Sequence, residues 1–306
     1  MEIPYRSRIA LVTGASRGIG AAFVRELATR GIGGLVLVAR AQDELEELAK
    51  ELRIKYAMPP DAPIVVLPAD LSHPDAPEKI KAETDRLGMP IGLLINNAGF
   101  GSHGFFHTLT PEKERDMVQV NIAALTALTR LYLPEMVERG SGAILNVSST
   151  AAFQPVPYMA TYAATKAFVQ SFSEALWAEM QECGSPVRIL ALCPGGTTTH
   201  FGDGLTRGGF ENLPHDTPEN VARVGIDALN GDHPHAVVGA LNQWVVQIPR
   251  FLPRKNSARM TARLFRPVRN AEASRSNLEP GKALALAAVA TGIAALTVAL
   301  ASRRRN

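Results

Sequence analysis

The sequence predicts an α/β fold in which helices cover both faces of one doubly wound parallel sheet. Three observations lead to this prediction. Short apolar runs alternate with helical stretches over about 240 residues, the first run meets a glycine-rich turn, and no internal repeat interrupts the alternation. With 306 residues, 46% of them hydrophobic and 20% charged, the chain is long enough for one large core.

The apolar runs are predicted to be strands because each is short, rich in branched residues and followed by a turn or a helical pattern. Connections between parallel strands of one sheet are expected to be right-handed. Strands are expected at residues 9–12, 35–39, 64–67, 91–95, 143–148, 187–193 and 236–239. Helices are expected after the first turn as far as Arg30, at 43–56, from about Pro74, and at 111–137, 159–182 and 218–229.

The first strand runs into the turn TGASRGIG, residues 13–20, which precedes a helix. A strand, a glycine-rich turn and a helix N-terminus form a site for a pyrophosphate, because backbone N–H groups and the helix dipole face the anion. The spacing is G-x-x-x-G-x-G, which taken alone also fits an ordinary tight turn. The cofactor-binding candidates in this turn are Gly14, Ser16, Arg17, Gly18, Ile19 and Gly20.

Two further candidates follow the second and third strands. Arg40 ends the second strand, where a nucleotide-binding unit reads the adenosine ribose, and Arg17 projects from the turn. Together they favour a 2′-phosphate, and so NADP over NAD; the alternative is that both are solvated surface charges. Asp70 either accepts a hydrogen bond from the adenine amino group or caps the helix expected near Pro74.

Asn97, in the run NNAG after the fourth strand, is expected beside a bound ribose, with side-chain amides of this run tying neighbouring strands together. Asn121 lies in an apolar helical stretch, so its amide must find partners; it either clamps the backbone or also holds a water next to Lys166. Pro194 and Thr199 belong to the turn after the sixth strand, where open α/β sheets bind ligands. Residues 200–216 are expected to form a loop that closes over substrate.

Ser149, Tyr162 and Lys166 form the candidate catalytic group. Tyr162 and Lys166 are four residues apart in a predicted helix, which places the phenol and the ammonium on one face. A positive charge within about 4–6 Å favours the phenolate. Ser149, at the end of the preceding strand, is expected opposite the helix, where its hydroxyl meets the oxygen that Tyr162 protonates.

With these residues the chain resembles the short-chain dehydrogenase/reductase family in its single-domain, Rossmann-fold, NADP-preferring form, over about residues 8–240. The resemblance is carried by TGASRGIG at 13–20, NNAG at 96–99, Asn121, Ser149, Tyr162-x-x-x-Lys166 and the turn from Pro194 to Thr199.

The resemblance implies a role for each catalytic candidate. Tyr162 is the implied general acid/base, and Lys166 is the implied residue that lowers its pKa and binds the nicotinamide ribose. Ser149 would orient the carbonyl, and Asn121 would be a link in a proton relay. Arg17 and Arg40 would select NADP.

The implied activity is an NADP(H)-dependent oxidoreductase that transfers hydride between nicotinamide and a ketone or secondary alcohol, without a metal. Aromatic and apolar residues near the catalytic end of the sheet favour an apolar ketone such as a 3-oxoacyl chain, a steroid or a ketosphingoid; ordinary packing is the alternative. Other readings are an alcohol or sugar dehydrogenase running oxidatively, and an NADPH-binding scaffold or sensor that recruits partners through its tail. The family also implies a homodimer or homotetramer.

The C-terminal part differs from the rest of the chain in charge. Residues 250–306 hold 12 Lys and Arg against Glu272 and Glu279, although the whole chain carries only +3. We therefore divide the chain into a Rossmann domain (1–240), a basic amphipathic segment (241–281) and an Ala-rich apolar helix (282–306).

The tail is the candidate membrane attachment. Residues 244–269 mix aromatic and cationic side chains, with prolines at 249 and 253 that break them into short pieces, and fit an anionic membrane surface. Residues 283–301 are uncharged and span about 28 Å if helical, close to the bilayer core; packing on protein is the alternative. No signal peptide is visible, and neither of the two cysteines is in a metal-ligand spacing, so we expect a cytoplasmic protein that the tail could attach to the cytoplasmic face of a membrane. The basic segment lacks a base-reading module, so we expect no binding of nucleic acid.

Overall fold

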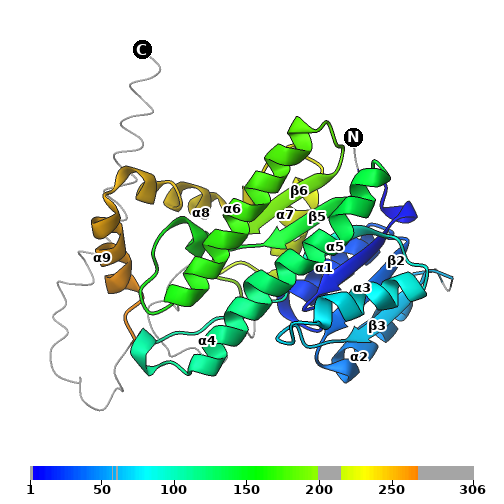
Figure 1. Cartoon of the computed structure of the whole chain (residues 1–306), viewed down its shortest axis with the longest axis horizontal. Helices are drawn as coiled ribbons and strands as arrows, with labels where there is room; N and C mark the ends of the chain where they lie inside the picture. The colour runs from blue at the N-terminus through cyan, green and yellow to red at the C-terminus, as the bar shows by residue number, and fades with distance from the viewer. Residues whose placement is uncertain (1–2, 57, 60, 199–214, 268–306) are drawn as a thin grey trace. The chain divides into compact units, whose positions relative to one another are not determined.

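Seven parallel strands form one sheet in the order β3-β2-β1-β4-β5-β6-β7 (Figure 1). The computed structural model describes residues 3–56, 58–59, 61–198 and 215–267. The chain builds the sheet outward from β1 to β3, returns to β4 beside β1, and continues to β7 on the other side. The strands are β1 (Ile9–Thr13), β2 (Gly34–Ala39), β3 (Ile64–Pro68), β4 (Ile91–Asn96), β5 (Ala143–Val147), β6 (Arg188–Cys193) and β7 (His235–Val237).

Helices cover both faces of the sheet, and alternate residues of each strand point to opposite faces. Val12 of β1 packs in one core with α1, α2 and α7, whereas Leu11 packs in a second core with α3, α5 and α6. Burial on both faces explains why the strands are nearly unbroken apolar runs. The helices are α1 (Gly18–Thr29), α2 (Gln42–Lys55), α3 (Ala76–Arg86), α4 (Pro111–Val118), α5 (Leu125–Glu138), α6 (Ala160–Glu182), α7 (Pro218–Ala228), α8 (Ala240–Val245) and α9 (Arg254–Leu264).

The predicted fold class is confirmed, with corrections to two helices. The helix expected at 111–137 is interrupted by a π-helical segment, η3 (Gln119–Ala124), between α4 and α5. A π turn inserts one extra residue into the helical ladder and is frequent at functional sites. The helix expected near Pro74 begins later, at Ala76, with Asp75 as its N-cap residue.

The segment after β7 belongs to the same compact unit as the sheet, which runs to Pro267. The predicted domain boundary after residue 240 therefore falls inside this unit. α8 is followed by the 3₁₀ helix η7 (Ile248–Phe251) and then by α9, so prolines 249 and 253 separate short pieces as expected. The predicted helix at 282–306 lies outside the described residues.

Candidate active site

The turn between β1 and α1 lies at the carboxyl end of the sheet, where α1 begins. Gly14 and Gly18 have φ values of +64° and +56°, in the left-handed region that favours glycine. A Cβ on Gly20 would lie 2.0 Å from the Gly14 carbonyl oxygen, so the helix start packs directly on the turn. Arg17, the N-cap residue of α1, makes no side-chain cap hydrogen bond. The first-turn N–H groups are thus left without a side-chain cap, which fits a pyrophosphate.

Asn97 ties this turn to the end of β4. Its Nδ2 donates to the carbonyl oxygens of Thr13 (2.9 Å) and Gly14 (3.3 Å), and its backbone N–H donates to Thr13 Oγ1 (3.0 Å). Ser16 is half-buried in the turn and Ile19 packs against the core beneath it. The turn is therefore held in shape by protein contacts alone.

Arg17, Arg40 and Asp70 follow the carboxyl ends of three neighbouring parallel strands, β1, β2 and β3. Arg17 is exposed and pairs with Glu44 at 3.4 Å, and Arg40 is exposed after β2. Burial, the largest influence on the Asp70 pKa, raises it, but hydrogen bonds from Ser72 and the charge of Arg40 leave it below its usual value. Asp70 Oδ1 accepts from the Ser72 N–H (3.0 Å) and does not cap α3, so that alternative is excluded.

Ser149, Tyr162 and Lys166 come together where β5 ends beside the start of α6. The Ser149 hydroxyl hydrogen-bonds with Tyr162 and also accepts from the Ala151 N–H at 3.1 Å. Lys166 Nζ lies 5.8 Å from the centroid of the Tyr162 ring. It donates to the carbonyl oxygen of Val147 at 2.8 Å. The set can therefore supply a proton, a hydroxyl and a cation at one place.

Burial dominates the electrostatics of both titratable groups. It raises the pKa of Tyr162 to about 12, although the hydrogen bond with Ser149 partly offsets the rise. Burial also lowers the pKa of Lys166 to about 8, against a smaller opposing effect of Cys193. The expected lowering of the Tyr162 pKa by Lys166 is not found, because the ammonium is turned toward the Val147 carbonyl and burial outweighs its charge.

Asn121 lies in the π-helical segment and bridges to α6. Its amide binds both backbone groups of Phe100, accepting from the N–H (3.2 Å) and donating to the carbonyl (3.0 Å). The same Nδ2 donates to Thr165 Oγ1 at 3.0 Å, and that hydroxyl donates to the Tyr162 carbonyl at 2.8 Å. A Cβ on Gly99 would lie 3.0 Å from Asn121 Oδ1 and 3.4 Å from Lys166 Nζ. The amide thus clamps the Phe100 backbone beside Lys166.

Pro194 closes the site on the β6 side. Its carbonyl oxygen accepts from the Thr150 N–H at 2.9 Å, which fixes the β6 turn against the residue after Ser149. Thr199, the other candidate of this turn, and most of the predicted loop 200–216 lie outside the described residues.

Apolar side chains adjoin Tyr162, as predicted for the substrate side. Val156 and Phe100 pack in one cluster with Tyr162. The rings of Phe105 and Tyr158 meet edge to face, with centroids 5.1 Å apart. Tyr158 has φ of +69°, which no other non-glycine residue of the described part shares. Such a strained backbone needs support from its surroundings and is common at binding sites.

Sequence reasoning missed three groups of the site. The Val147 carbonyl holds Lys166, the Thr165 hydroxyl links Asn121 to Tyr162, and the Phe265 ring packs on the cluster that contains Tyr162. None of them has a signal in the sequence, because a strand carbonyl, a helical threonine and a tail phenylalanine are ordinary features of any chain.

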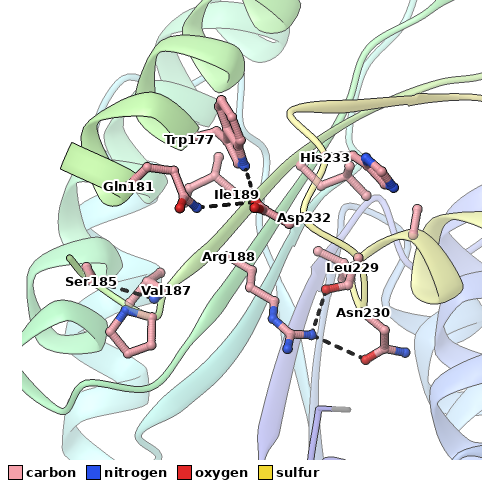
Figure 2. A pocket seen from close by; sticks show the side chains of 14 residues that line it. Trp177, Gln181, Ser185, Val187, Arg188, Ile189, Leu229, Asn230, Asp232 and His233 are labelled. Carbon is pink, nitrogen blue, oxygen red and sulfur yellow. Dashed lines mark hydrogen bonds between the residues drawn. The ribbon is translucent and has the colours of Figure 1, made fainter. Parts of the chain in front are cut away.

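A hollow of about 340 Å³ lies elsewhere, where β6 begins and α6 ends (Figure 2). Trp177 and Gln181 reach it from α6 and donate to Asp232, and Arg188 donates to the Leu229 carbonyl. None of the candidate residues lines it. Trp177 lies fifteen positions after Tyr162 on α6, about 22 Å along the helix, so this hollow is remote from Tyr162.

The described residues hold neither a metal centre nor a membrane span. They contain no group of three or more His, Cys, Asp or Glu side chains that is arranged to hold a metal ion. Among them no helix combines the length and apolar character needed to cross a membrane, and the candidate span at 283–301 lies outside the described residues.

Comparison with known proteins shows the relationships of this chain. Residues 8–208 match the short chain dehydrogenase family model. Very-long-chain 3-oxoacyl-CoA reductase-B of Danio rerio is 36% identical over 246 residues, 77% of this chain and 74% of the relative. The very-long-chain 3-oxoacyl-CoA reductase of Homo sapiens is 32% identical over 242 residues, 76% and 73% of the two chains.

Solved structures are similar over most of the chain. A structure from a study of 7β-hydroxysteroid dehydrogenase stereoselectivity has a TM-score of 0.74 at 25% identity, covering 86% of this chain and all of that one. A short-chain dehydrogenase from Sphingobium yanoikuyae in complex with NADPH has a TM-score of 0.69 at 29% identity, covering 88% and 100%. The chain belongs to the short-chain dehydrogenase family of oxidoreductases that use a nicotinamide cofactor.

Proposed function

We propose that the protein is an NADPH-dependent ketoreductase that acts on a lipid-like 3-oxoacyl thioester. The observation that carries this proposal is the buried group in which Ser149 hydrogen-bonds with Tyr162 and the Lys166 ammonium lies 5.8 Å from the Tyr162 ring centroid. A protonated phenol suits reduction, where the carbonyl oxygen must receive a proton. The 3-oxoacyl-CoA reductases among its relatives support the substrate class.

The chain's own residues have separate tasks in this proposal. Ser149 Oγ donates a hydrogen bond to the substrate carbonyl oxygen, and Tyr162 Oη transfers its proton to that oxygen. The Lys166 ammonium, 5.8 Å from the Tyr162 ring centroid, supplies a positive charge that offsets part of the cost of the buried phenolate. Asn121 positions α6 through Thr165 and keeps the Phe100 backbone in place. When bound, the nicotinamide cofactor supplies the hydride.

The preference for NADP rests on Arg17 and Arg40. Both guanidinium groups are exposed beside the cofactor turn, and among the described residues Arg17 pairs with one partly exposed carboxylate, that of Glu44. A 2′-phosphate would gain charge-assisted hydrogen bonds from them. Arg40→Asp should therefore weaken NADPH binding far more than NADH binding. The matched control is Lys50→Asp, which makes the same charge change at an exposed position of α2. Equal losses for the two cofactors in Arg40→Asp would refute the assignment.

The substrate proposal is tested by following NADPH oxidation with short, medium and long 3-oxoacyl thioesters, a steroid ketone and a small diketone. We expect kcat/KM to rise with acyl length, since each buried methylene contributes about 0.8 kcal/mol. Reduction of the steroid ketone but of no thioester would overturn the substrate class. Tight NADPH binding without reduction of any carbonyl would instead favour a scaffold or sensor.

Two further parts of the proposal concern assembly and location. We propose a homo-oligomer, to be tested by light scattering, with a purely monomeric protein as the contrary result. We also propose a cytoplasmic enzyme whose residues 282–306 attach it to the cytoplasmic face of a membrane. Deleting residues 282–306 should then shift the protein toward the soluble fraction; unchanged membrane fractionation would contradict an anchor in that segment.

A further inference from the structure

We propose that the segment after β7 docks the catalytic unit onto an anionic lipid bilayer, with the substrate side of the active site facing the lipid. This inference rests on the proposed function for its second half, delivery of a lipid-like substrate. Its first half, the docking surface, stands on the described residues themselves.

The docking surface contains large apolar side chains that the fold leaves uncovered. Phe251 is 85% exposed, Trp244 68% and Leu241 60%. On α8, positions 241, 244 and 245 share one face, while Val246 is buried against the body. We define the docking surface as the exposed apolar residues Leu241, Trp244, Val245, Phe251, Met260 and Leu264, together with the cations named next.

The charges of the docking surface indicate the kind of partner that it binds. The sequence from residue 240 to 267 contains no Asp or Glu. The six cations are exposed, and none of them forms an ion pair with a carboxylate of the described residues; they are Arg250, Arg254, Lys255, Arg259, Arg263 and Arg266. Exposed aromatic side chains interleaved with unpaired cations fit a lipid interface, where rings enter the acyl boundary and cations meet anionic headgroups.

The docking surface is attached to the wall of the active site. Thr261 Oγ1 donates to the Pro155 carbonyl at 2.8 Å, and the Phe265 carbonyl bonds to His103 Nε2 at 2.9 Å. The Phe265 ring packs on the cluster that contains Tyr162. α9 therefore borders the apolar cluster that contains the catalytic tyrosine.

The loop after β4 adds to the same side of the molecule. Phe105 and Phe106, two and three residues beyond His103, are 51% and 65% exposed. Phe105 meets the Tyr158 ring, four residues before Tyr162. An acyl chain leaving the bilayer here would pass apolar side chains on its way to Tyr162, without crossing water.

The two tryptophans provide a direct test, because Trp244 belongs to the docking surface and Trp177 lies at the remote hollow (Figure 2). Trp177→Phe leaves Trp244 as the sole tryptophan of the full-length protein. With vesicles of brominated phosphatidylcholine and about 30% phosphatidylglycerol, its emission should shift to the blue and be quenched, less so in high salt or without the anionic lipid. Trp244→Phe, the matched control, keeps only Trp177, which should not be quenched.

Three results would overturn the docking surface. Vesicle flotation without quenching of Trp244 would show attachment by another segment. Trp244 emission that is already blue and insensitive to lipid would show that this chain or a second copy covers the surface. Equal quenching of Trp177 and Trp244 would show non-specific adsorption.

A turnover measurement separates this inference from the proposed function. In Trp244→Ser/Phe251→Ser, reduction of a long-chain thioester presented in anionic vesicles should fall about tenfold or more, whereas a short soluble thioester should be reduced as before. Unchanged reduction in vesicles would refute delivery from the bilayer. No turnover by the wild type on any thioester would refute the proposed function, while the fluorescence result would stand.

Discussion

Replacing Lys166 by methionine should stabilise the folded protein at neutral pH, although it removes a catalytic candidate. The Lys166 ammonium is buried, and its pKa falls from 10.5 to about 8. In free energy this corresponds to a cost of about 3 kcal/mol for keeping the charge in the fold. The hydrogen bond to the Val147 carbonyl returns about 1–2 kcal/mol and would be lost in Lys166→Met. We therefore expect a net gain of about 1–2 kcal/mol near pH 7.

The way the free energy of unfolding changes with pH shows whether the lowered pKa of Lys166 is the cause of the stability difference. Between the folded pKa of about 8 and the unfolded value of 10.5, the unfolded state holds more protons at Lys166, so stability rises with pH. About 2 kcal/mol of the cost should be relieved between pH 7 and pH 9.5. Tyr162 and Cys193, whose pKa values burial raises to about 12, act in the opposite direction at high pH but are present in both proteins. The difference between wild type and Lys166→Met isolates the lysine.

Denaturant unfolding at several pH values measures this difference. The advantage of Lys166→Met should shrink as pH rises from 7 to 9.5. Lys81→Met is the control. Burial lowers the Lys81 pKa, but the hydrogen bonds and charges of Asp85 and Glu135 together outweigh burial and leave the pKa above its usual value. The Lys81→Met variant should therefore lose stability near pH 7. A Lys166→Met protein that is less stable than wild type at pH 7, or whose advantage does not change with pH, would refute the reasoning.

Two other predictions concern stability. Asn121→Ala should cost about 2–4 kcal/mol in denaturant unfolding, because its buried amide makes three hydrogen bonds. Thr126→Ala on the next helical turn removes a hydroxyl without a described partner and should be near neutral; equal costs would contradict the clamp. Gly14→Ala should cost about 2–3 kcal/mol and weaken NADPH binding, since a Cβ there would lie 2.9 Å from a neighbouring side chain. Gly140 has the same left-handed backbone, but a Cβ there would meet open space, so Gly140→Ala should cost only about 1 kcal/mol. Similar losses of thermal stability in Gly14→Ala and Gly140→Ala would argue against tight packing at the turn.

The parts of the fold that could be predicted are those encoded in neighbouring residues. Apolar runs bounded by turns identified all seven strands, and the glycine-rich run at 13–20 correctly predicted a turn between the first strand and the first helix. The four-residue spacing of Tyr162 and Lys166 correctly placed both on one helix, since helix geometry is local.

The remainder depends on contacts between distant segments. The π-helical segment is stabilised by Asn121 binding the Phe100 backbone and Thr165, partners far away in the sequence. The direction of the Lys166 ammonium depends on a carbonyl of β5. The sequence therefore could not show that the expected lowering of the Tyr162 pKa would be missing. The docking of α9 on the 155–158 loop likewise rests on pairs such as Thr261 and Pro155, over a hundred residues apart.

The central claim is that Tyr162 delivers the proton during carbonyl reduction. A second buried tyrosine makes the decisive comparison possible, because the Tyr132 hydroxyl is bonded to Thr84 Oγ1 at 2.9 Å, between α5 and α3, and Tyr132 is none of the candidate site residues. The measurement is kcat/KM for a 3-oxoacyl thioester in Tyr162→Phe and Tyr132→Phe, with NADPH binding measured on both. We expect Tyr162→Phe to bind NADPH but lose about 10²–10⁴ in kcat/KM, and Tyr132→Phe to lose stability while keeping its activity. A Tyr162→Phe enzyme within about tenfold of the wild-type kcat/KM would contradict the claim.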